Sequence, residues 1–391
     1  MARFPRRKFL KSAGFGLFPA VIPFSAKANR STSSRSPLNG RSVRFTSDGE
    51  IFEPAEYLAE LQSVNERTPI VRDRYAQGGA VAALERAFVE KTGKEKAIYM
   101  PTGTMANELA ISVLSGDNAK VFVQDTSHVY RDEADAAQRI FGKRLIGLAP
   151  GKTYFTLDEL KAANENLAID EHIPGKVGAV SIENPNRRMN GTVVPIEEIQ
   201  RISGYCRHQN IPLHLDGARI FIASAYTGVD VRTYASYFDT VYISLYKYLG
   251  ASGGAVLCGP AAIIDQMPLL IKIHGGLIAG NWLNAAMALH RLEGFEKRMK
   301  RAIETSQELF AALNATQKLK ISPIAGGSNI HKLELDKRID PMTLRDKLFE
   351  EFTIRIPPPN EKKELYLYVN ETLLNQPIEY LLTAFRKCCG A

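Results

Sequence analysis

The sequence predicts an α/β fold, with a large domain whose mostly parallel sheet is covered by helices and a smaller C-terminal α+β domain. Short segments that are apolar at nearly every residue recur along the chain, which is typical of strands buried on both faces. Longer segments with apolar residues at helical spacing separate them. The chain has 391 residues, of which 45% are hydrophobic and 24% are charged. This length suits two domains, and the balance is that of a folded soluble protein.

The first 28 residues have the order of a signal peptide. Arg6-Arg7-Lys8-Phe9-Leu10-Lys11 is followed by an apolar stretch over residues 12–24 and then by Ala26-Lys27-Ala28. The arginine pair resembles the twin-arginine export signal of bacteria, so we expect cleavage after Ala28 and a periplasmic or other extracytoplasmic location. A membrane helix is the alternative, but about 13 apolar residues are too few to span a bilayer. Residues 29–44 are predicted to form a flexible linker.

Much of the positive charge lies in this leader. The chain carries 50 basic and 42 acidic residues, and residues 1–28 hold six of the basic ones and no acidic one. The remainder is therefore nearly neutral, which removes the main sequence argument for nucleic-acid binding. We expect no nucleic-acid partner, and no membrane association once the leader is removed.

The four cysteines are Cys206, Cys258, Cys388 and Cys389. They show no C-x-x-C spacing and no histidine in a zinc pattern, so we expect no structural metal. An exported destination permits disulfides, but the sequence does not require them.

Helices and strands alternate through the first part of the chain. Val81, Leu84 and Phe88 share one helix face, and Gly93 follows as a stop signal. The predicted helices of this part are 80–92, 105–113, 196–207 and 282–302. The predicted buried strands are 97–100, 121–123, 145–148, 177–182, 211–215, 240–245 and 255–258. We assign residues 45–299, including an N-terminal arm, to the large domain.

The pattern changes in the tail, where strands alternate between apolar and polar residues as half-exposed strands do. The predicted elements are a helix over 302–313, a strand over 329–335, a helix over 341–352 and a strand over 365–369. This order predicts the small domain, residues 300–391.

Three features lie where predicted strands end. Thr102-Gly103-Thr104 precedes a helix, whose free N–H groups and positive dipole can bind a phosphate. Asp216 ends an apolar strand, where ligands of open α/β sheets bind. Lys247 follows another, and a buried lysine has a lowered pKa and a nucleophilic amine. Each has an ordinary alternative, namely a turn capped by threonine, an aspartate that caps the next turn, and a surface lysine.

Together these features are what a pyridoxal-phosphate site requires. The lysine carries the aldehyde, the aspartate keeps the pyridine nitrogen protonated, and the helix N-terminus holds the phosphate. We therefore expect pyridoxal 5'-phosphate as the cofactor.

Longer stretches of sequence around these residues are familiar. They are Tyr99–Asn107, Ser127-His128, Glu133-Ala134, Glu183-Asn184, Gly191–Pro195, His214–Arg219 and Lys247 to Leu257. In these segments the chain resembles the threonine aldolase and β-eliminating lyase family, whose members have the aspartate-aminotransferase-like fold (fold type I of the pyridoxal-phosphate enzymes). The resemblance runs from about Phe45 to Leu292.

The resemblance implies a set of cofactor-binding residues. Lys247 would bind the cofactor covalently and Asp216 would pair with its pyridinium. Gly103 and Thr104 would hold the phosphate, and Lys272 matches a lysine near that phosphate.

It also implies residues that act on the substrate. His128 would stack on the cofactor ring and could take a proton, unless it only caps the next helix. Arg219 and Ser47 would hold the substrate carboxylate, although Arg219 could instead form a salt bridge with an acidic residue. Tyr75 would reach the phosphate of a neighbouring subunit.

The chain also departs from the family pattern. Tyr246-Lys247-Tyr248 stands where the family has Ser-Lys-Gly, and residues 75–79 and 275–280 differ from the usual segments. A second carboxylate-binding arginine, normally in the C-terminal domain, aligns with Tyr366. Arg355 or Lys363 could replace it.

The resemblance implies a pyridoxal-phosphate-dependent lyase that cleaves the Cα–Cβ bond of a β-hydroxy amino acid such as threonine, giving glycine and an aldehyde. β-Elimination, or another reaction on a different amino acid, is the alternative. A second alternative is a non-catalytic exported protein that binds the cofactor or an amine. The family resemblance also implies a homodimer or homotetramer.

Overall fold

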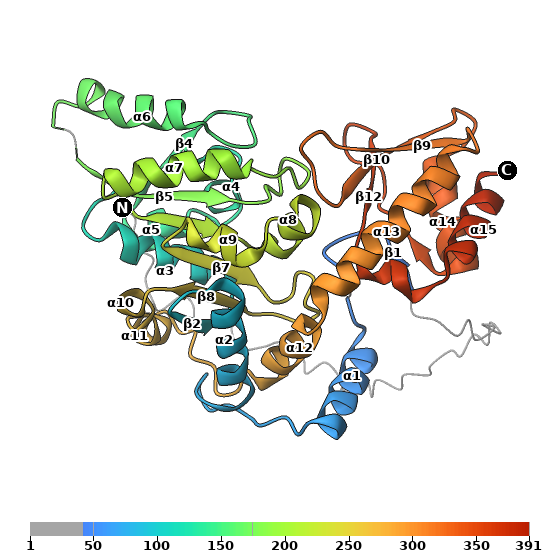
Figure 1. The fold of residues 1–391 in the computed structure, drawn as a ribbon, viewed down its shortest axis with the longest axis horizontal. Coiled ribbons are helices and arrows are strands. Elements are labelled where there is room, and N and C mark those ends of the chain that lie inside the picture. Colours follow the sequence, from blue (N-terminus) through green and yellow to red (C-terminus); the bar gives the residue numbers. More distant parts are fainter. Residues whose placement is uncertain (1–41, 50, 174, 391) are drawn as a thin grey trace, which may run out of the picture. The chain divides into compact units, whose positions relative to one another are not determined.

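The computed structural model describes residues 42–49, 51–173 and 175–390 (Figure 1). These described residues belong to one compact unit. The predicted signal peptide, residues 1–28, and most of the predicted linker lie outside the described residues.

A seven-stranded sheet forms the centre of this unit, in the order β2-β8-β7-β6-β5-β3-β4. Its strands are β2 Lys96–Met100, β3 Lys120–Gln124, β4 Arg144–Leu148, β5 Val177–Glu183, β6 Leu213–Asp216, β7 Thr240–Ser244 and β8 Ala255–Gly259. Neighbouring strands are parallel except at β8, which is antiparallel to both β2 and β7. The mostly parallel sheet predicted from the sequence is confirmed.

Helices connect these strands. They are α1 Pro54–Arg67, α2 Gly79–Thr92, α3 Gly103–Ser115, α4 His128–Arg131, α5 Ala136–Phe141, α6 Leu157–Asp170, α7 Ile196–His208, α8 Ile220–Thr227, α9 Val231–Ser236, α10 Ala261–Ile264, α11 Met267–Ile273 and α12 Trp282–Leu292. The helices predicted over 80–92, 105–113 and 196–207 correspond to α2, α3 and α7.

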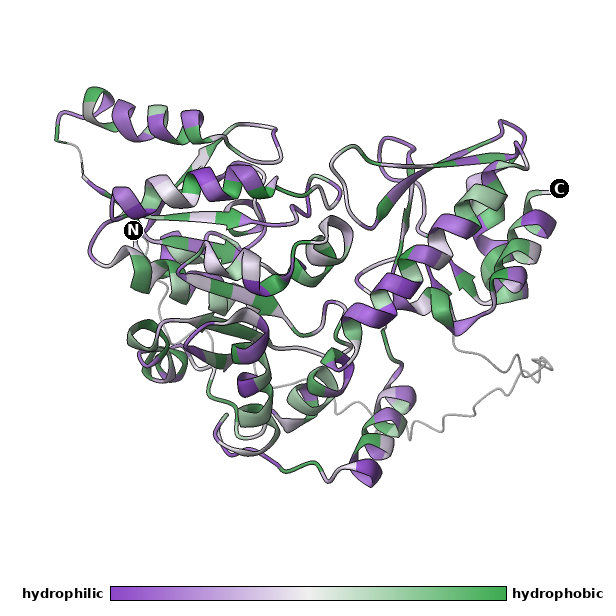
Figure 2. Ribbon diagram, viewed as in Figure 1, coloured by the Kyte–Doolittle hydropathy of each residue, from purple (hydrophilic) through white to green (hydrophobic). Residues whose placement is uncertain are grey.

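Both faces of the sheet are buried, as the apolar strand pattern predicts. Successive residues of β8 point to opposite faces, so Val256 packs in one cluster with Phe88 of α2, and Leu257 packs in another with Leu109 of α3. In Figure 2 the strands are mainly green, whereas the helices around them carry purple, hydrophilic residues on part of their surface.

The prediction of a single helix over residues 282–302 is wrong. α12 ends at Leu292, and a new helix, α13 Phe295–Asn314, begins after Gly294. Gly294 has a φ of 67°, a left-handed conformation that glycine adopts easily and that ends a helix.

The C-terminal part contains a three-stranded antiparallel sheet in the order β12-β10-β9. Its elements are β9 Leu319–Pro323, β10 Ile330–Leu335, α14 Pro341–Phe352, β11 Ile354–Arg355, β12 Leu365–Tyr368, a 3-10 helix Glu371–Asn375 and α15 Ile378–Cys389. α13 runs continuously through the domain boundary predicted at residues 299–300.

A short strand near the N-terminus joins this C-terminal part. β1, Val43–Arg44, pairs in parallel with β11. The linker prediction is therefore wrong for Val43 and Arg44, which form strand hydrogen bonds. The pairing places the residues that follow β1 next to those that follow β11.

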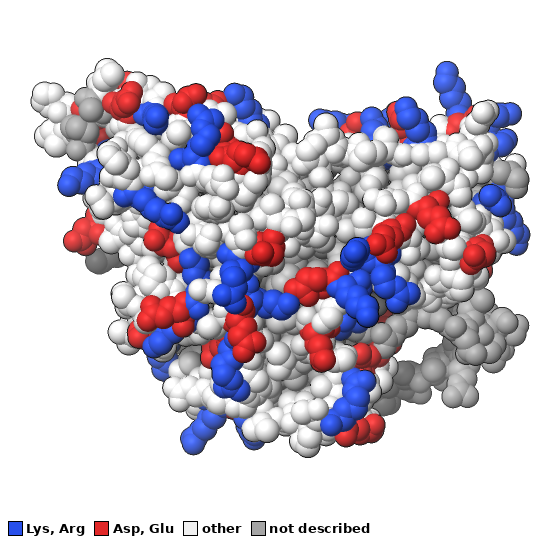
Figure 3. All heavy atoms as spheres, viewed as in Figure 1, with Lys and Arg blue, Asp and Glu red and all other residues white. Residues whose placement is uncertain are grey.

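The surface shown in Figure 3 carries basic and acidic side chains interspersed with one another. None of the helices in the described part of the chain has the length and apolar character needed to cross a membrane. All four cysteines are free thiols.

Candidate active site

Polar residues gather at the carboxyl ends of the central strands. Glu183, the last residue of β5, is the register partner of Asp216, the last residue of β6. Asp216 is in turn paired with Tyr242 of β7. Two carboxylates therefore lie side by side at the sheet edge where α/β proteins bind ligands.

The predicted phosphate-binding turn begins α3. The Thr102 hydroxyl accepts a hydrogen bond from the Met105 N–H at 3.2 Å, so the ordinary cap is present. Gly103 lies so close to Tyr242 that a Cβ atom built on it would be 2.0 Å from the tyrosine Oη. Only glycine fits there, and the backbone N–H groups at the start of α3 remain able to face an anion.

Replacing Gly103 with alanine is expected to lower the free energy of unfolding by about 1–3 kcal/mol, because the new methyl group overpacks against the buried Tyr242. Thermal unfolding would measure the change. Gly204→Ala is the matched control, since a Cβ atom there meets open space on α7 and should not destabilise the helix. Equal stability of the two variants would contradict the close packing at Gly103.

A chain of buried hydrogen bonds holds Asp216. The Asn107 Nδ2 donates to Asp216 Oδ2 at 3.0 Å and to Glu133 Oε1 at 2.8 Å. The Asn107 Oδ1 therefore accepts from His214 Nε2 at 3.0 Å, and the other ring nitrogen of His214 lies 2.8 Å from the Thr240 hydroxyl. Burial lowers the pKa of His214 to about 4, so this histidine is neutral at physiological pH.

His128 lies beside the same carboxylates. Its Nδ1 is 2.9 Å from Glu133 Oε1, and the ligand atoms of His128, Glu133 and Asp216 all lie within 4.8 Å of one another. The hydrogen bond with Glu133 raises the pKa of His128, and burial raises the pKa of Glu133. Ser127, not His128, occupies the N-cap position of α4, so the capping alternative for His128 is wrong.

Glu183 fixes the position of His128 through the backbone. Its carboxylate accepts hydrogen bonds from the N–H groups of His128 at 2.7 Å and Arg187 at 2.9 Å. Burial, together with the neighbouring Asp216, raises the pKa of Glu183 to about 7.

Lys247 follows β7 and is buried, with 8% of its surface exposed. Its ammonium forms no ion pair with any residue in the described ranges, and Nζ lies 5.3 Å from the centre of the Tyr246 ring. Burial, and then the charge of Arg219, lower the pKa of Lys247. The surface-lysine alternative is therefore wrong, and the side chain is a buried, unpaired amine.

Arg219 lines a cavity of about 630 Å³ together with Ser47 and Asp48. Its Nε and Nη2 donate to the two carboxylate oxygens of Asp48 at 2.7 and 2.8 Å. The salt-bridge alternative for Arg219 is thus present, with Asp48 as the partner. Because this pair uses only one edge of the guanidinium, Nη1 remains available to a substrate carboxylate.

The residues proposed for a second carboxylate contact lie in different places. Arg355 lines the same cavity, stacked over the Phe349 ring at 4.2 Å. The Tyr366 hydroxyl instead donates to Glu364 at 2.9 Å, and Lys363 is exposed in a turn. Of the three, Arg355 alone lines the cavity.

Two other predicted residues lie apart from these contacts. Lys272 is exposed on α11, which packs against α3, and its side chain forms no ion pair with a described residue. Tyr75 is 45% exposed and lines a separate cavity that also includes Pro101, next to the start of α3.

These residues fit pyridoxal phosphate. Lys247 offers the buried, unpaired amine, the turn at Gly103 leaves a backbone cradle with no room for a side chain, and Asp216 is an oriented carboxylate. Sequence reasoning did not assign roles to Asp48 and Asn107, although each lies within or beside a segment that carried the family resemblance.

Comparisons with known proteins agree with this geometry. The beta-eliminating lyase family profile matches residues 67–335. The chain is 33% identical over 226 residues to the low-specificity L-threonine aldolase of Candida albicans, which covers 56% of this chain and 58% of that protein. It is 31% identical over 235 residues to the low specificity L-threonine aldolase of Escherichia coli K12, which covers 59% of this chain and 68% of that one. The match to the Candida protein thus spans little more than half of its length.

A solved structure has the same fold. It comes from Exiguobacterium sp. 255-15 and is named for the aromatic amino acid beta-eliminating lyases and threonine aldolases. The TM-score is 0.73 at 24% identity, over 88% of this chain and 98% of that one. The predicted fold class is confirmed.

Proposed function

We propose that this chain, which belongs to the β-eliminating lyase family, is a pyridoxal-phosphate-dependent lyase that cleaves the Cα–Cβ bond of a β-hydroxy amino acid such as threonine. The products would be glycine and an aldehyde. The observation that carries the proposal is the buried, unpaired amine of Lys247 at the same sheet edge as Asp216, with Arg219 on the adjoining cavity. The relatives named as threonine aldolases support it.

When bound, pyridoxal phosphate supplies an aldehyde for an amine and a ring that accepts the electrons of a bond broken at Cα. Lys247 would offer its amine to that aldehyde, and the N–H groups at Gly103 and Thr104 would hold the phosphate. Asp216 would hold a proton at the ring nitrogen. Arg219 and Ser47 would hold the substrate carboxylate and so fix how Cα is oriented. Arg355 is the second cation available to that carboxylate.

His128 is the base in this proposal and takes the proton of the substrate's β-hydroxyl group. Only the neutral imidazole can do so, so kcat/KM falls as the pH drops through the pKa of His128, which the hydrogen bond that His128 donates to Glu133 raises. Glu133→Gln removes that charge. We expect the acidic limb of the pH profile to move to lower pH by about one unit. An unmoved limb would contradict the assignment of His128 as the base.

The direct test is turnover. The full chain is purified with pyridoxal phosphate and incubated with threonine, and glycine and acetaldehyde are assayed together with 2-oxobutanoate and ammonia. Glycine and acetaldehyde in equal amounts are expected. 2-Oxobutanoate and ammonia would instead establish β-elimination, and the absence of all four products would overturn threonine as the substrate.

We also propose that the protein is exported by the twin-arginine route and works as a homodimer or homotetramer outside the cytoplasm. The leader motif around Arg6-Arg7 supports export. The exposed apolar side chains of Val71, Tyr75 and Ile278 support self-association, in which Tyr75 would reach the phosphate of a neighbouring subunit. Light scattering of the purified protein measures its oligomeric state, and a monomer would contradict the proposed self-association.

A further inference from the structure

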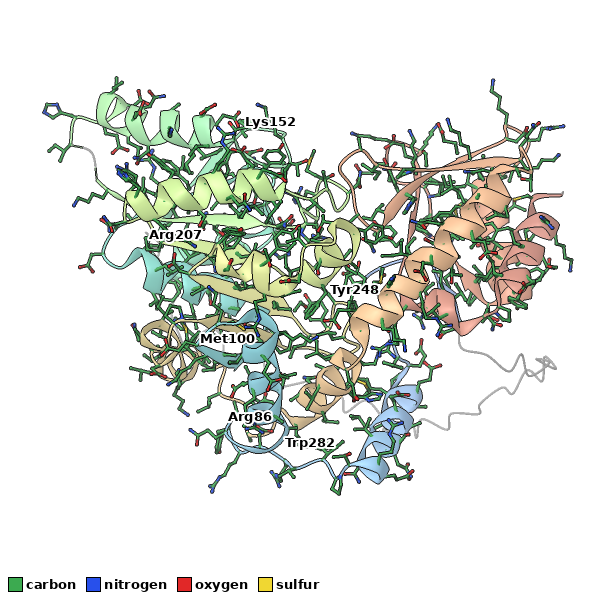
Figure 4. All side chains as sticks on the ribbon, in the orientation of Figure 1. Arg86, Met100, Lys152, Arg207, Tyr248 and Trp282 are labelled. Carbon is green, nitrogen blue, oxygen red and sulfur yellow. The ribbon has the colours of Figure 1, made fainter. Side chains whose placement is uncertain are left out.

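Tyr248, which directly follows Lys247, has an unusual backbone conformation. Its φ is 70°, in the left-handed region that side chains other than glycine rarely adopt, and only 4% of its surface is exposed. Figure 4 labels Tyr248 between α8 and α13. A bulky residue keeps such a conformation only where its surroundings hold it, and such positions cluster at functional sites.

One support is Asn329, the buried residue before β10. Its Nδ2 donates to the Tyr248 hydroxyl at 2.8 Å and to the Val369 carbonyl at 2.9 Å. The amide therefore uses both N–H groups, and the tyrosine oxygen accepts one of them. The phenol proton of Tyr248 remains free to donate elsewhere.

Asp48 is a second hydrogen-bond partner of Tyr248. The Tyr248 N–H donates to the Asp48 carbonyl at 2.7 Å, which ties the two residues together through the backbone. Burial opposes ionisation of Asp48, but the charge of Arg219 and the hydrogen bonds it donates lower the pKa of the Asp48 carboxyl. The Asp48 carboxylate also accepts the hydrogen bonds that Arg219 donates from Nε and Nη2.

We propose that Tyr248 is a positioning residue, bonded to Asn329 through its hydroxyl and to Asp48 through its backbone N–H, and that it so holds Arg219 with its Nη1 edge turned to the substrate carboxylate. Tyr248, Asp48, Asn329 and Arg219 all line the same cavity, so the connection runs along the wall of the binding site. Glycine would adopt this φ without strain, yet it would leave Asn329 and Asp48 unconnected. The inference rests on the proposed function, because it assigns Arg219 to the carboxylate of an amino acid.

The test compares two ligands that differ only in a carboxylate, glycine and methylamine, on the full chain loaded with pyridoxal phosphate. Their dissociation constants are measured from the change in visible absorption, without turnover. In Tyr248→Phe the ring stays but the hydroxyl is lost. We expect the dissociation constant of glycine to rise about tenfold, because the hydroxyl that Asn329 holds is lost and a buried hydrogen bond goes with it, and that of methylamine to stay the same.

Tyr226→Phe is the matched control. Tyr226, on α8, also has a buried hydroxyl, but this hydroxyl has no hydrogen-bond partner among the described residues. Its removal should change neither dissociation constant. Asp48→Asn is a second variant and should weaken glycine binding more than Tyr248→Phe does, again without effect on methylamine.

Equal weakening of both ligands in Tyr248→Phe, or no change in either, would overturn the positioning role. A parent protein that binds both ligands but does not cleave threonine would contradict only the proposed reaction. A parent protein that binds neither ligand would overturn the positioning role together with the cofactor assignment.

Discussion

Replacing Lys247 with alanine is expected to lower the turnover of threonine by at least about a thousandfold. Lys247 is the only buried amine at the carboxyl edge of β5, β6 and β7 in the part of the chain that the structure describes, so no neighbour can replace it. The variant should also lose the visible absorption that covalent attachment of the cofactor to the protein produces. Absorption spectra and a glycine assay on the purified variant measure both effects.

Lys300→Ala is the control for this variant, because Lys300 is exposed on α13 and lies in no described site. It should keep full turnover and an unchanged spectrum. The alanine at position 247 removes a buried amine that has no ion-pair partner, so we expect the protein to remain folded. Unchanged turnover in Lys247→Ala would remove the basis of the proposed lyase activity, whatever the substrate.

The central sheet could be predicted because burial on both faces leaves a local mark, a short run of apolar residues. The segment 177–182, for example, is β5 almost to the residue. The pairing of β1 with β11 left no such mark. Val43 finds its partner Ile354 only in the folded chain, and a two-residue strand is too short to show a period. The break at Gly294 also escaped prediction, since an isolated glycine can lie within a helix or end one.

The residues of the site also differ in how far the sequence could predict their positions. Asp216 and Lys247 each follow an apolar strand, and parallel strands bring their carboxyl ends to one edge, so their meeting could be predicted. The Arg219–Asp48 pair and the contact of Tyr248 with Asn329 join residues far apart in the chain. No spacing encodes such pairs. They depend on how the N-terminal segment and the strand β10 meet the loop after β7, which only the folded structure shows.

Replacing Asp216 with alanine is expected to lower kcat by about 10²–10³-fold, as loss of one oriented electrostatic group in an active site does. Asp216 is only 2% exposed, and its carboxylate accepts hydrogen bonds from Asn107 Nδ2 at 3.0 Å and from the Ala218 N–H at 3.2 Å. Held in this way, under the proposed function it would hold a proton at the ring nitrogen of pyridoxal phosphate, which would make the ring a better electron acceptor.

The Asp216→Ala variant differs from Lys247→Ala in what it should preserve. Lys247 and Arg219 remain, so covalent attachment of the cofactor and the preference for glycine over methylamine should persist while kcat falls. Asn107→Ala is the companion variant. It leaves the carboxylate in place but removes the hydrogen bond that orients it, so a smaller loss of kcat is expected. If Asp216→Ala kept kcat within tenfold of the parent, the carboxylate would have no role at the ring nitrogen. The buried chain from Thr240 through His214 and Asn107 would then contribute to catalysis only through the hydrogen bond that Asn107 donates to Glu133, the partner of His128.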